Sequence, residues 1–367
     1  MTLLELMVAL AIGSVLLIGL ATVFFNSSRT HRELEKSGLM IENGRYAISV
    51  LYEDLRHAGF YGYFFDIPTP VTTAPNPCET ADITALTNGM TWPIQGYKAA
   101  SASARPDIST TSCDDALLVN DNLSPGSDIL VLRRADSGVF TGVIANSTEN
   151  EVGAVYLQAN GQAFQFQLGS NGADVPTENA DGVTYDSTNP AHLRKYPSSA
   201  TNTQAADTRK YHIHVYFVAP CSAGTGADGV CQNTDPRLPT LKRLELSSDG
   251  TTAQMSIVPL VEGIEYFKVE YGIDDTPTAV DPSTGLTGDG VPDTYVTAPT
   301  AAQWPNVVTV RVHVLARNTK ATDDYTDDKT YTLAGAAFNP TEKKYKRHVF
   351  STEARPMNIG GRREIPE

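Results

Sequence analysis

The sequence predicts an α+β protein in which a long N-terminal α-helix packs on an antiparallel, β-rich head with long loops. Three observations predict this fold. An uncharged apolar run of twenty residues lies near the N-terminus, an amphipathic charged segment follows it without a proline, and short alternating segments fill the chain beyond residue 125. The first half of the helix is expected to cross a membrane and the second half to lie in water.

The composition fits a secreted, loop-rich β protein. The chain has 367 residues, with 28 Lys+Arg against 42 Asp+Glu, and its net charge is -14. Because phosphate binding needs Lys and Arg gathered on one face, no nucleic-acid partner is expected. Hydrophobic residues make up 41% and charged residues 19%, so the chain can bury a core.

The apolar run extends from Leu6 to Phe25. At ~1.5 Å per residue, a helix of this length crosses roughly 30 Å of hydrocarbon. A cleaved signal peptide is the alternative, but no basic region precedes the run and no small-x-small cleavage motif closes it. Glu5 stands at the start of the run. Since an unpaired charge there is costly, Glu5 is expected to pair with a free α-amine, its own or that of a neighbouring chain.

The helix is expected to continue in water to residue 58, where Gly59 and Gly62 end it. One apolar stripe is predicted to dock this half on the head of the same chain. A dimeric coiled coil is the alternative, but Gly38 and Gly44 interrupt its heptads. The stripe consists of Leu34, Ile41, Ile48 and Leu55, together with Gly44, Leu51 and Ala58.

The rest of the chain reads as strands and loops. Three segments are expected: a membrane-spanning or filament-core helix over 1–25, its soluble continuation over 26–60, and a head over 61–367. Insertions rich in Thr, Ser, Asn, Gly and Pro fall at about 68–125, 170–210 and 274–303. Strands are predicted at Ile129–Leu132, Ala154–Leu157, Ala163–Leu168, Tyr211–Val218, Leu241–Leu246, Ile264–Tyr271, Val307–Ala316 and Tyr345–Phe350.

The four cysteines indicate disulfides formed outside the cytoplasm. Four cysteines allow three pairings. Cys221 and Cys231 flank a short Gly-rich loop, which favours a bond between them, and Cys78 and Cys113 then pair by elimination.

Two further groups are candidate metal ligands. The acidic segment with Asp274, Asp275, Asp289 and Asp293 offers the oxygen ligands that calcium prefers, although a solvated acidic turn is the default. His212 and His214 fall on one face of a predicted strand, and exposed sheet histidines are the favoured interpretation over a metal pair. No cofactor other than calcium is suggested. The sequence holds no nucleophile elbow, P-loop or His-Glu-x-x-His motif, and no enzyme activity is expected.

Residues Met1 to Leu10 resemble the mature amino terminus of type IV pilins and of type II secretion pseudopilins. In that family a prepilin peptidase cuts before residue one and methylates the new amine, which implies a processed, N-methylated Met1. Met1 stands where the family most often has phenylalanine. The acidic residue of the family falls on Glu5, which implies that Glu5 pairs with the methylated amine of a neighbouring subunit.

Residues 41–62, 125–134 and 260–274 resemble the PilW branch of minor pilins. The J-type pseudopilins of type II secretion are similar in plan but usually shorter. The resemblance implies a type IV pilus subunit that helps initiate or cap assembly. A filament-forming pilin of an extracellular fibre, a type II secretion pseudopilin and an adhesive tip subunit are the alternatives.

The same resemblance implies partners and a location. The partners would be major and minor pilins, met through the N-terminal helix, and the prepilin peptidase. The protein would cross the bacterial inner membrane once before assembly and then enter an extracellular pilus, with its head in the periplasm or outside the cell.

Overall fold

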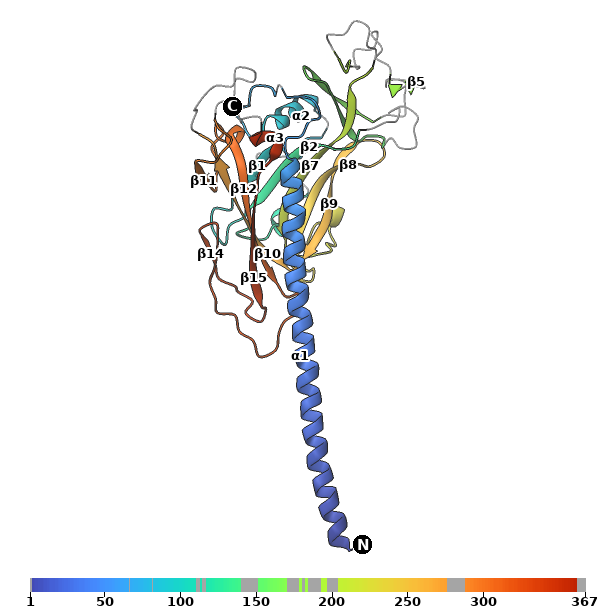
Figure 1. The fold of residues 1–367 in the computed structure, drawn as a ribbon, viewed down its shortest axis with the longest axis vertical. Helices are drawn as coiled ribbons and strands as arrows, with labels where there is room; N and C mark the ends of the chain where they lie inside the picture. Colours follow the sequence, from blue (N-terminus) through green and yellow to red (C-terminus); the bar gives the residue numbers. More distant parts are fainter. Residues whose placement is uncertain are drawn as a thin grey trace.

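The structure is a computed structural model with one long helix and a β-rich head (Figure 1). The α+β class expected from the sequence is confirmed. The structure describes residues 2–65, 67–80, 82–109, 113, 117–139, 151–169, 178–179, 182–183, 193–196, 204–275 and 288–361.

Helix α1 (Leu3–His57) is a single helix of 55 residues, about 80 Å long, and its N-terminal half extends beyond the head (Figure 1). Ala58 is its C-cap. Gly59 and Gly62 follow with φ values of +74° and +70°, which glycine adopts at little cost. The expected helix end at residue 58 is confirmed, and the chain turns there into the head.

The larger sheet is antiparallel and has the order β1-β2-β7-β3-β4, with β8 paired to β7 and β9 paired to β8. β2 is buried on both faces, because Leu130 and Leu132 face one core cluster and Ile129 and Val131 face the other. This explains the unbroken apolar run Ile129–Leu132 at the start of β2. The strands are β1 (Ile94–Tyr97), β2 (Ile129–Ala135), β3 (Val155–Ala159), β4 (Phe164–Leu168), β7 (Asp207–Ala219), β8 (Thr240–Ser248) and β9 (Ala253–Glu262).

The smaller sheet, also antiparallel, has the order β11-β10-β12-β15. Short hairpins and helices complete the described part of the head. The strands of the smaller sheet are β10 (Ile264–Ile273), β11 (Thr294–Val296), β12 (Val307–Arg317) and β15 (Arg347–Ala354). The remaining elements are the β5 (Glu178–Asn179) and β6 (Gly182–Val183) hairpin, the β13 (Tyr331–Leu333) and β14 (Ala336–Phe338) hairpin, α2 (Ile83–Met90), α3 (Met357–Gly360), and 3-10 turns at Asn120–Asn122, Ala227–Gly229 and Trp304–Asn306.

The strands expected from the sequence overlap β2, β3, β4, β7, β8, β10, β12 and β15. The three insertions expected to be loops also contain regular secondary structure. α2 and β1 lie within 68–125, β5 and β6 within 170–210, and β11 within 274–303. β9 was also missed, because Pro259 and a mostly half-exposed surface hide its alternation.

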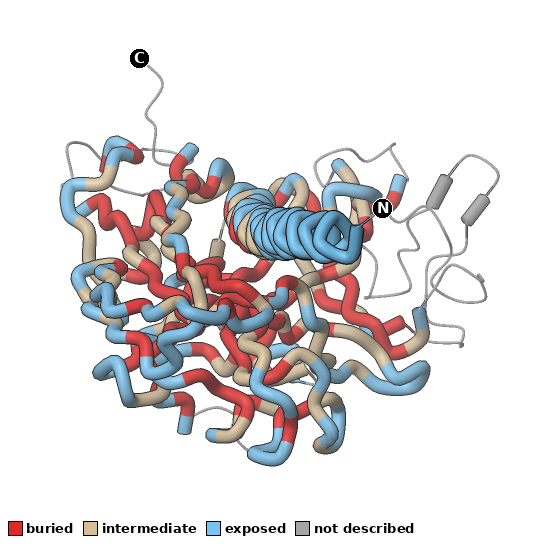
Figure 2. The backbone as a smooth tube through the Cα atoms, turned by 90° about the horizontal axis from the view of Figure 1, so that it is seen from below, coloured by how far each residue is buried: buried red, intermediate tan, exposed pale blue. Residues whose placement is uncertain are grey.

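The C-terminal half of α1 lies along one side of the head, over the core (Figure 2). The predicted stripe is partly wrong. Gly44, Leu51, Ala58 and Leu55 are buried as expected, but Leu34 and Ile41 are 64% and 40% exposed. The buried face instead follows the heptads Met40, Ala47, Asp54 and Gly44, Leu51, Ala58. One half of the predicted stripe is therefore correct, and the other half is displaced by one residue toward Met40, Ala47 and Asp54. A purely apolar pattern leaves out the charged Asp54.

Candidate assembly interface on the N-terminal helix

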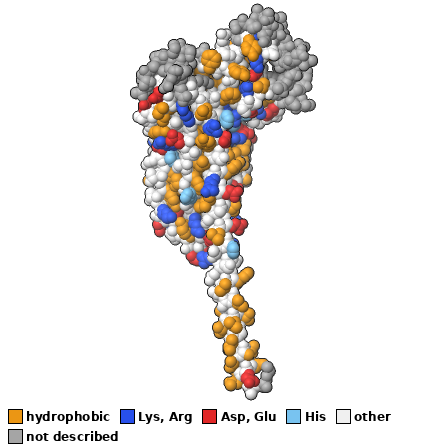
Figure 3. Space-filling view, viewed as in Figure 1, with side chains coloured by type: hydrophobic (Ala, Val, Ile, Leu, Met, Phe, Trp, Pro, Cys, Tyr) orange, Lys and Arg blue, Asp and Glu red, His pale blue; other side chains and the backbone are white. Residues whose placement is uncertain are grey.

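The projecting half of α1 is apolar on all sides, and hydrophobic side chains cover it from end to end (Figure 3). Every Leu, Ile, Val, Met and Phe side chain from Leu3 to Phe25 is at least 50% exposed. Leaving them in water would cost on the order of 20–40 kcal/mol. By length and composition this helix is able to cross a membrane. This apolar surface is therefore a candidate for contact with lipid or with other helices.

Polar side chains inside this stretch are bonded to the helix itself. The Ser14 hydroxyl donates to the Ala11 carbonyl, and the Thr22 hydroxyl donates to the Ile18 carbonyl, each at 2.8 Å. Because these hydroxyls use the backbone as acceptor, they add little cost in an apolar environment. The segment is thus compatible both with lipid and with a bundle of helices.

Glu5 forms a capping box with Thr2 at the start of α1. The Thr2 backbone N–H donates to Glu5 Oε2 at 2.9 Å, and the Glu5 N–H donates to the Thr2 hydroxyl at 3.4 Å. The carboxylate also lies at the positive end of the helix dipole. Met1 lies outside the described residues, so the expected pairing of its amine with Glu5 stays a prediction. The capping role of Thr2 was missed, although Thr-x-x-Glu is its sequence signature.

A buried polar cluster fastens the top of α1 to the larger sheet. Asp54 Oδ1 accepts from Arg134 Nε of β2 at 2.7 Å. Asp54 Oδ2 accepts from the Tyr216 hydroxyl at 2.9 Å and lies 2.6 Å from His214 Nδ1, both on β7. Burial alone would raise the pKa of Asp54, but the charges and hydrogen bonds of His214 and Arg134 hold it well below its usual value.

The loop from residue 318 to residue 346, here the clasp loop, holds α1 lower down. Arg29 Nη2 donates to Asp324 Oδ2 at 2.7 Å. Glu33 accepts from the Thr322 hydroxyl at 2.9 Å, and Lys36 donates to the Ala321 carbonyl at 2.9 Å. The hydrogen bond from Lys36, with those from Lys346 and Thr322, lowers the pKa of Glu33 to about 2. These contacts fix α1 where it leaves the head.

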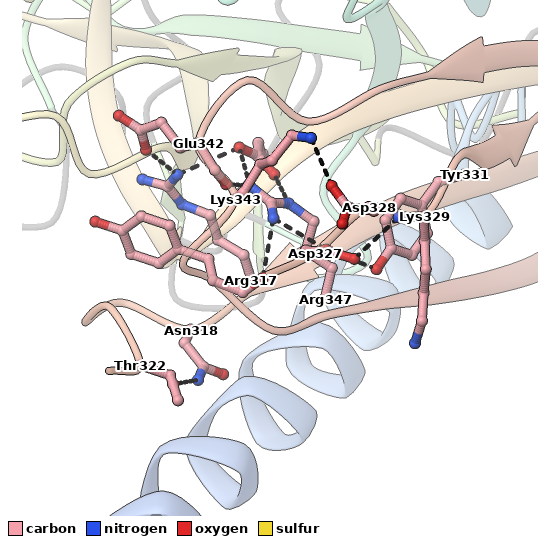
Figure 4. Close-up of polar contacts among 12 residues, drawn as sticks. Arg317, Asn318, Thr322, Asp327, Asp328, Lys329, Tyr331, Glu342, Lys343 and Arg347 are labelled. Atoms are coloured by element: carbon pink, nitrogen blue, oxygen red, sulfur yellow. Dashed lines mark hydrogen bonds and ion pairs between the residues drawn. The ribbon is translucent and has the colours of Figure 1, made fainter. Parts of the chain in front are cut away.

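The clasp loop is itself anchored by arginines of the smaller sheet (Figure 4). Arg347 of β15 is fully buried and pairs with Asp327 at 3.1 Å and with Glu265 of β10. Arg317 pairs with Glu342. The Tyr331 hydroxyl also donates to Asp327 at 2.9 Å. Because both ends of the loop are tied to the sheet, its contacts with α1 belong to a firmly held surface.

Between these two anchors α1 approaches the smaller sheet closely. A Cβ atom at Gly44 would lie 2.1 Å from Cε2 of Phe350 on β15. Glycine is required here because the aromatic ring occupies the space of a side chain. The helix is therefore positioned by a close contact as well as by charge.

The two histidines are not exposed sheet residues, contrary to expectation. They do share one face of β7, with ring centroids 5.4 Å apart. His214 is buried against Asp54, however, and His212 lies 3.3 Å from Asp136. Burial, with the neighbouring His214 and Arg134, lowers the pKa of His212 to about 4. The prediction failed because the sequence did not show that α1 covers this face.

The structure contains disulfides between Cys78 and Cys113 and between Cys221 and Cys231. The first has a sequence separation of 35 and closes a segment that contains α2 and β1; the second closes a loop at the end of β7. Cys113, Cys221 and Cys231 are buried in the core, and Cys78 is partly buried against it.

Among the described residues, the carboxylates of the acidic segment do not gather at one point. Asp274 Oδ2 accepts from the Gly290 N–H, Asp289 Oδ1 from the Val291 N–H, and Asp293 Oδ2 from the Asp275 N–H, each at 2.9 Å. These carboxylates thus shape the turn. Within the described ranges, no three His, Cys, Asp or Glu side chains are arranged to hold a metal ion. A further acidic residue of this segment, Asp281, lies outside those ranges. The calcium prediction gains no support from the described residues.

Comparison with known proteins finds a match for part of the β-rich head. The model of the family described as PilW, type IV pilus-assembly protein W, matches residues 215–358. The match runs from within β7 into α3 and includes the clasp loop and the 260–274 block. It supports a relation to a pilus-assembly family. No curated protein and no solved structure matches the chain.

Proposed function

We propose that the protein is a structural subunit of a type IV pilus, a PilW-type minor pilin that helps to initiate or cap assembly. The observation that carries the proposal is the projecting half of α1, a fully exposed apolar helix with one carboxylate at its start. The PilW match over 215–358 supports the pilus assignment. The two disulfides support a head that folds outside the cytoplasm.

In this proposal α1 rests in the inner membrane after a prepilin peptidase has processed Met1, and then moves into a bundle of pilin helices. Apolar side chains exchange lipid for helix contacts, so the net hydrophobic gain is small. Specific packing and the charge of Glu5 then set the register. Glu5 would exchange the Thr2 N–H for the methylated amine of a neighbouring subunit. The role is structural rather than catalytic.

The direct test changes Glu5 to Gln. Membrane insertion should be retained, because the apolar run is unchanged. Incorporation into sheared surface fibres should fall about tenfold, the cost of losing one charge-assisted hydrogen bond. Incorporation is measured as the ratio of protein in the fibre fraction to protein in the membrane fraction.

Two control variants separate pairing from capping. Thr2→Ala removes the capping hydroxyl but keeps the carboxylate, and Glu35→Gln removes an exposed carboxylate further along α1. Both should assemble close to the wild-type level. Normal incorporation of Glu5→Gln, or an equal loss in Thr2→Ala, would contradict the proposed pairing. A protein required for enzyme export but absent from fibres would instead be a secretion pseudopilin.

A further inference from the structure

A cavity of about 350 Å³ opens on the face of the smaller sheet that points away from α1. β10 alternates here: Phe267 and Val269 face the core beneath α1, whereas Tyr266 and Lys268 face the opposite side. Loop 98–102, Thr297 and the turn of the β13–β14 hairpin complete the walls. The volume is at the lower end of those that hold small organic ligands.

A buried ion pair lines this cavity. Lys268 Nζ lies 2.6 Å from Asp128 Oδ1, and both side chains are only 4% exposed. Asp128 is well satisfied, since it also accepts from the Ala99 N–H at 2.9 Å and the Val269 N–H at 3.2 Å. The ammonium of Lys268 has three N–H donors, and within the described part of the chain only Asp128 accepts one of them. Lys268 therefore has donors left for a ligand.

The lining carries more positive than negative charge. Lys98 lies at the exposed edge and donates to the Thr297 hydroxyl at 2.8 Å. Lys98 and Lys268 against Asp128 leave one excess positive charge, in a chain whose net charge is -14. The buried hydroxyl of Tyr266 has no hydrogen-bond partner among the described residues. Much of the remaining wall is alanine.

We propose that this cavity binds a small organic carboxylate. The carboxylate lies between Lys98 and Lys268, and the apolar body of the ligand lies against the alanine methyl groups and the Tyr266 ring. The binding site is separate from α1 and from the assembly surface. The inference stands whether or not the chain enters a pilus.

The test is isothermal titration of the full-length protein in detergent with benzoate. Benzamide has the same shape without the charge, and inorganic phosphate has the charge without the apolar body. Benzoate should bind saturably at one site, about tenfold or more tighter than either control compound. Benzamide lacks the ionised acceptor that strengthens the lysine hydrogen bonds, and phosphate lacks the apolar body that packs against the alanine wall. Absence of benzoate binding, or equal binding of phosphate, would overturn the proposal.

Matched variants locate the site. Ala336→Leu places a larger side chain in the cavity wall, on the side of β14 from which Phe338 packs on Tyr266. Ala302→Leu makes the same change at an exposed alanine that does not line the cavity. Lys98→Gln removes the charge at the edge, with the exposed Lys329→Gln as its control. Benzoate affinity should fall about tenfold in Ala336→Leu and Lys98→Gln and stay unchanged in the controls. Unchanged affinity in Ala336→Leu would place benzoate elsewhere and refute the site.

Discussion

Asp54 is the residue that binds α1 to the larger sheet. Its carboxylate is 5% exposed. It accepts hydrogen bonds from Arg134 and Tyr216 and lies 2.6 Å from His214 Nδ1. Removing one member of such a cluster leaves the others buried without a counter-charge, which costs more than the pair contributes. The position of α1 thus depends on a charged residue within an otherwise apolar face.

Asp54→Ala should lower the free energy of unfolding by about 3 kcal/mol, because Arg134 and His214 lose their acceptor. Urea denaturation in detergent followed by circular dichroism measures this. The adjacent Glu53 is exposed, and Glu53→Ala should change stability by less than about 0.5 kcal/mol. Equal effects of the two substitutions would show that the cluster does not anchor the helix.

His212 should make stability depend on pH between about 6.5 and 4. Its pKa falls from 6.5 to about 4 on folding, so the unfolded chain binds more protons in this window. The free energy of unfolding is therefore highest above pH 6.5 and decreases by on the order of 3 kcal/mol as the pH falls to about 4. Burial is the largest cause of this lowered pKa, His214 and Arg134 add to it, and Asp136 opposes it. Thermal unfolding across this range should show a weaker pH dependence in His212→Gln.

Among the secondary-structure elements, α1 and most strands could be predicted from local sequence patterns, but the contacts between these elements could not. The end of α1 was predicted because Gly59 and Gly62 signal it locally. The position of its buried face was not, because Leu34 stays exposed beside the clasp-loop contacts of Glu33 and Lys36. Asp54, in turn, is buried only through partners far away in sequence. The Lys268–Asp128 pair was missed for the same reason. Asp54 lies seven residues after the buried Ala47, and this spacing was the sequence signal for the burial of Asp54.

Two glycines of α1 should respond oppositely to alanine. At Gly44 a Cβ would overlap the Phe350 ring, so Gly44→Ala should destabilise the protein by about 1–3 kcal/mol. At Gly38 no atom lies within 4 Å of a Cβ, so Gly38→Ala should stabilise the helix by about 0.5–1 kcal/mol. Denaturant unfolding measures both. Adding Phe350→Leu should recover part of the loss at Gly44, and a lack of recovery would refute the close contact.

For the whole molecule, the structure separates two surfaces of α1. One half is held to the head by the Asp54 cluster, the Phe350 contact and the clasp loop, and the other half is exposed and apolar (Figures 1 and 3). A firmly held head on a free apolar helix is suited to assembly through the helix. The sequence predicted this division from the apolar run Leu6–Phe25 and from the amphipathic segment that follows it, because both patterns can be recognised without tertiary context.

The central claim is that assembly buries the projecting half of α1. Cryo-electron microscopy of fibres sheared from cells that make this protein tests it most directly. The account predicts that the head lies at a fibre end, with residues 3–25 among the helices of the fibre core and Glu5 against a neighbouring N-terminus. Fibres that lack the protein, or that carry it with this helix outside the core, would contradict the account.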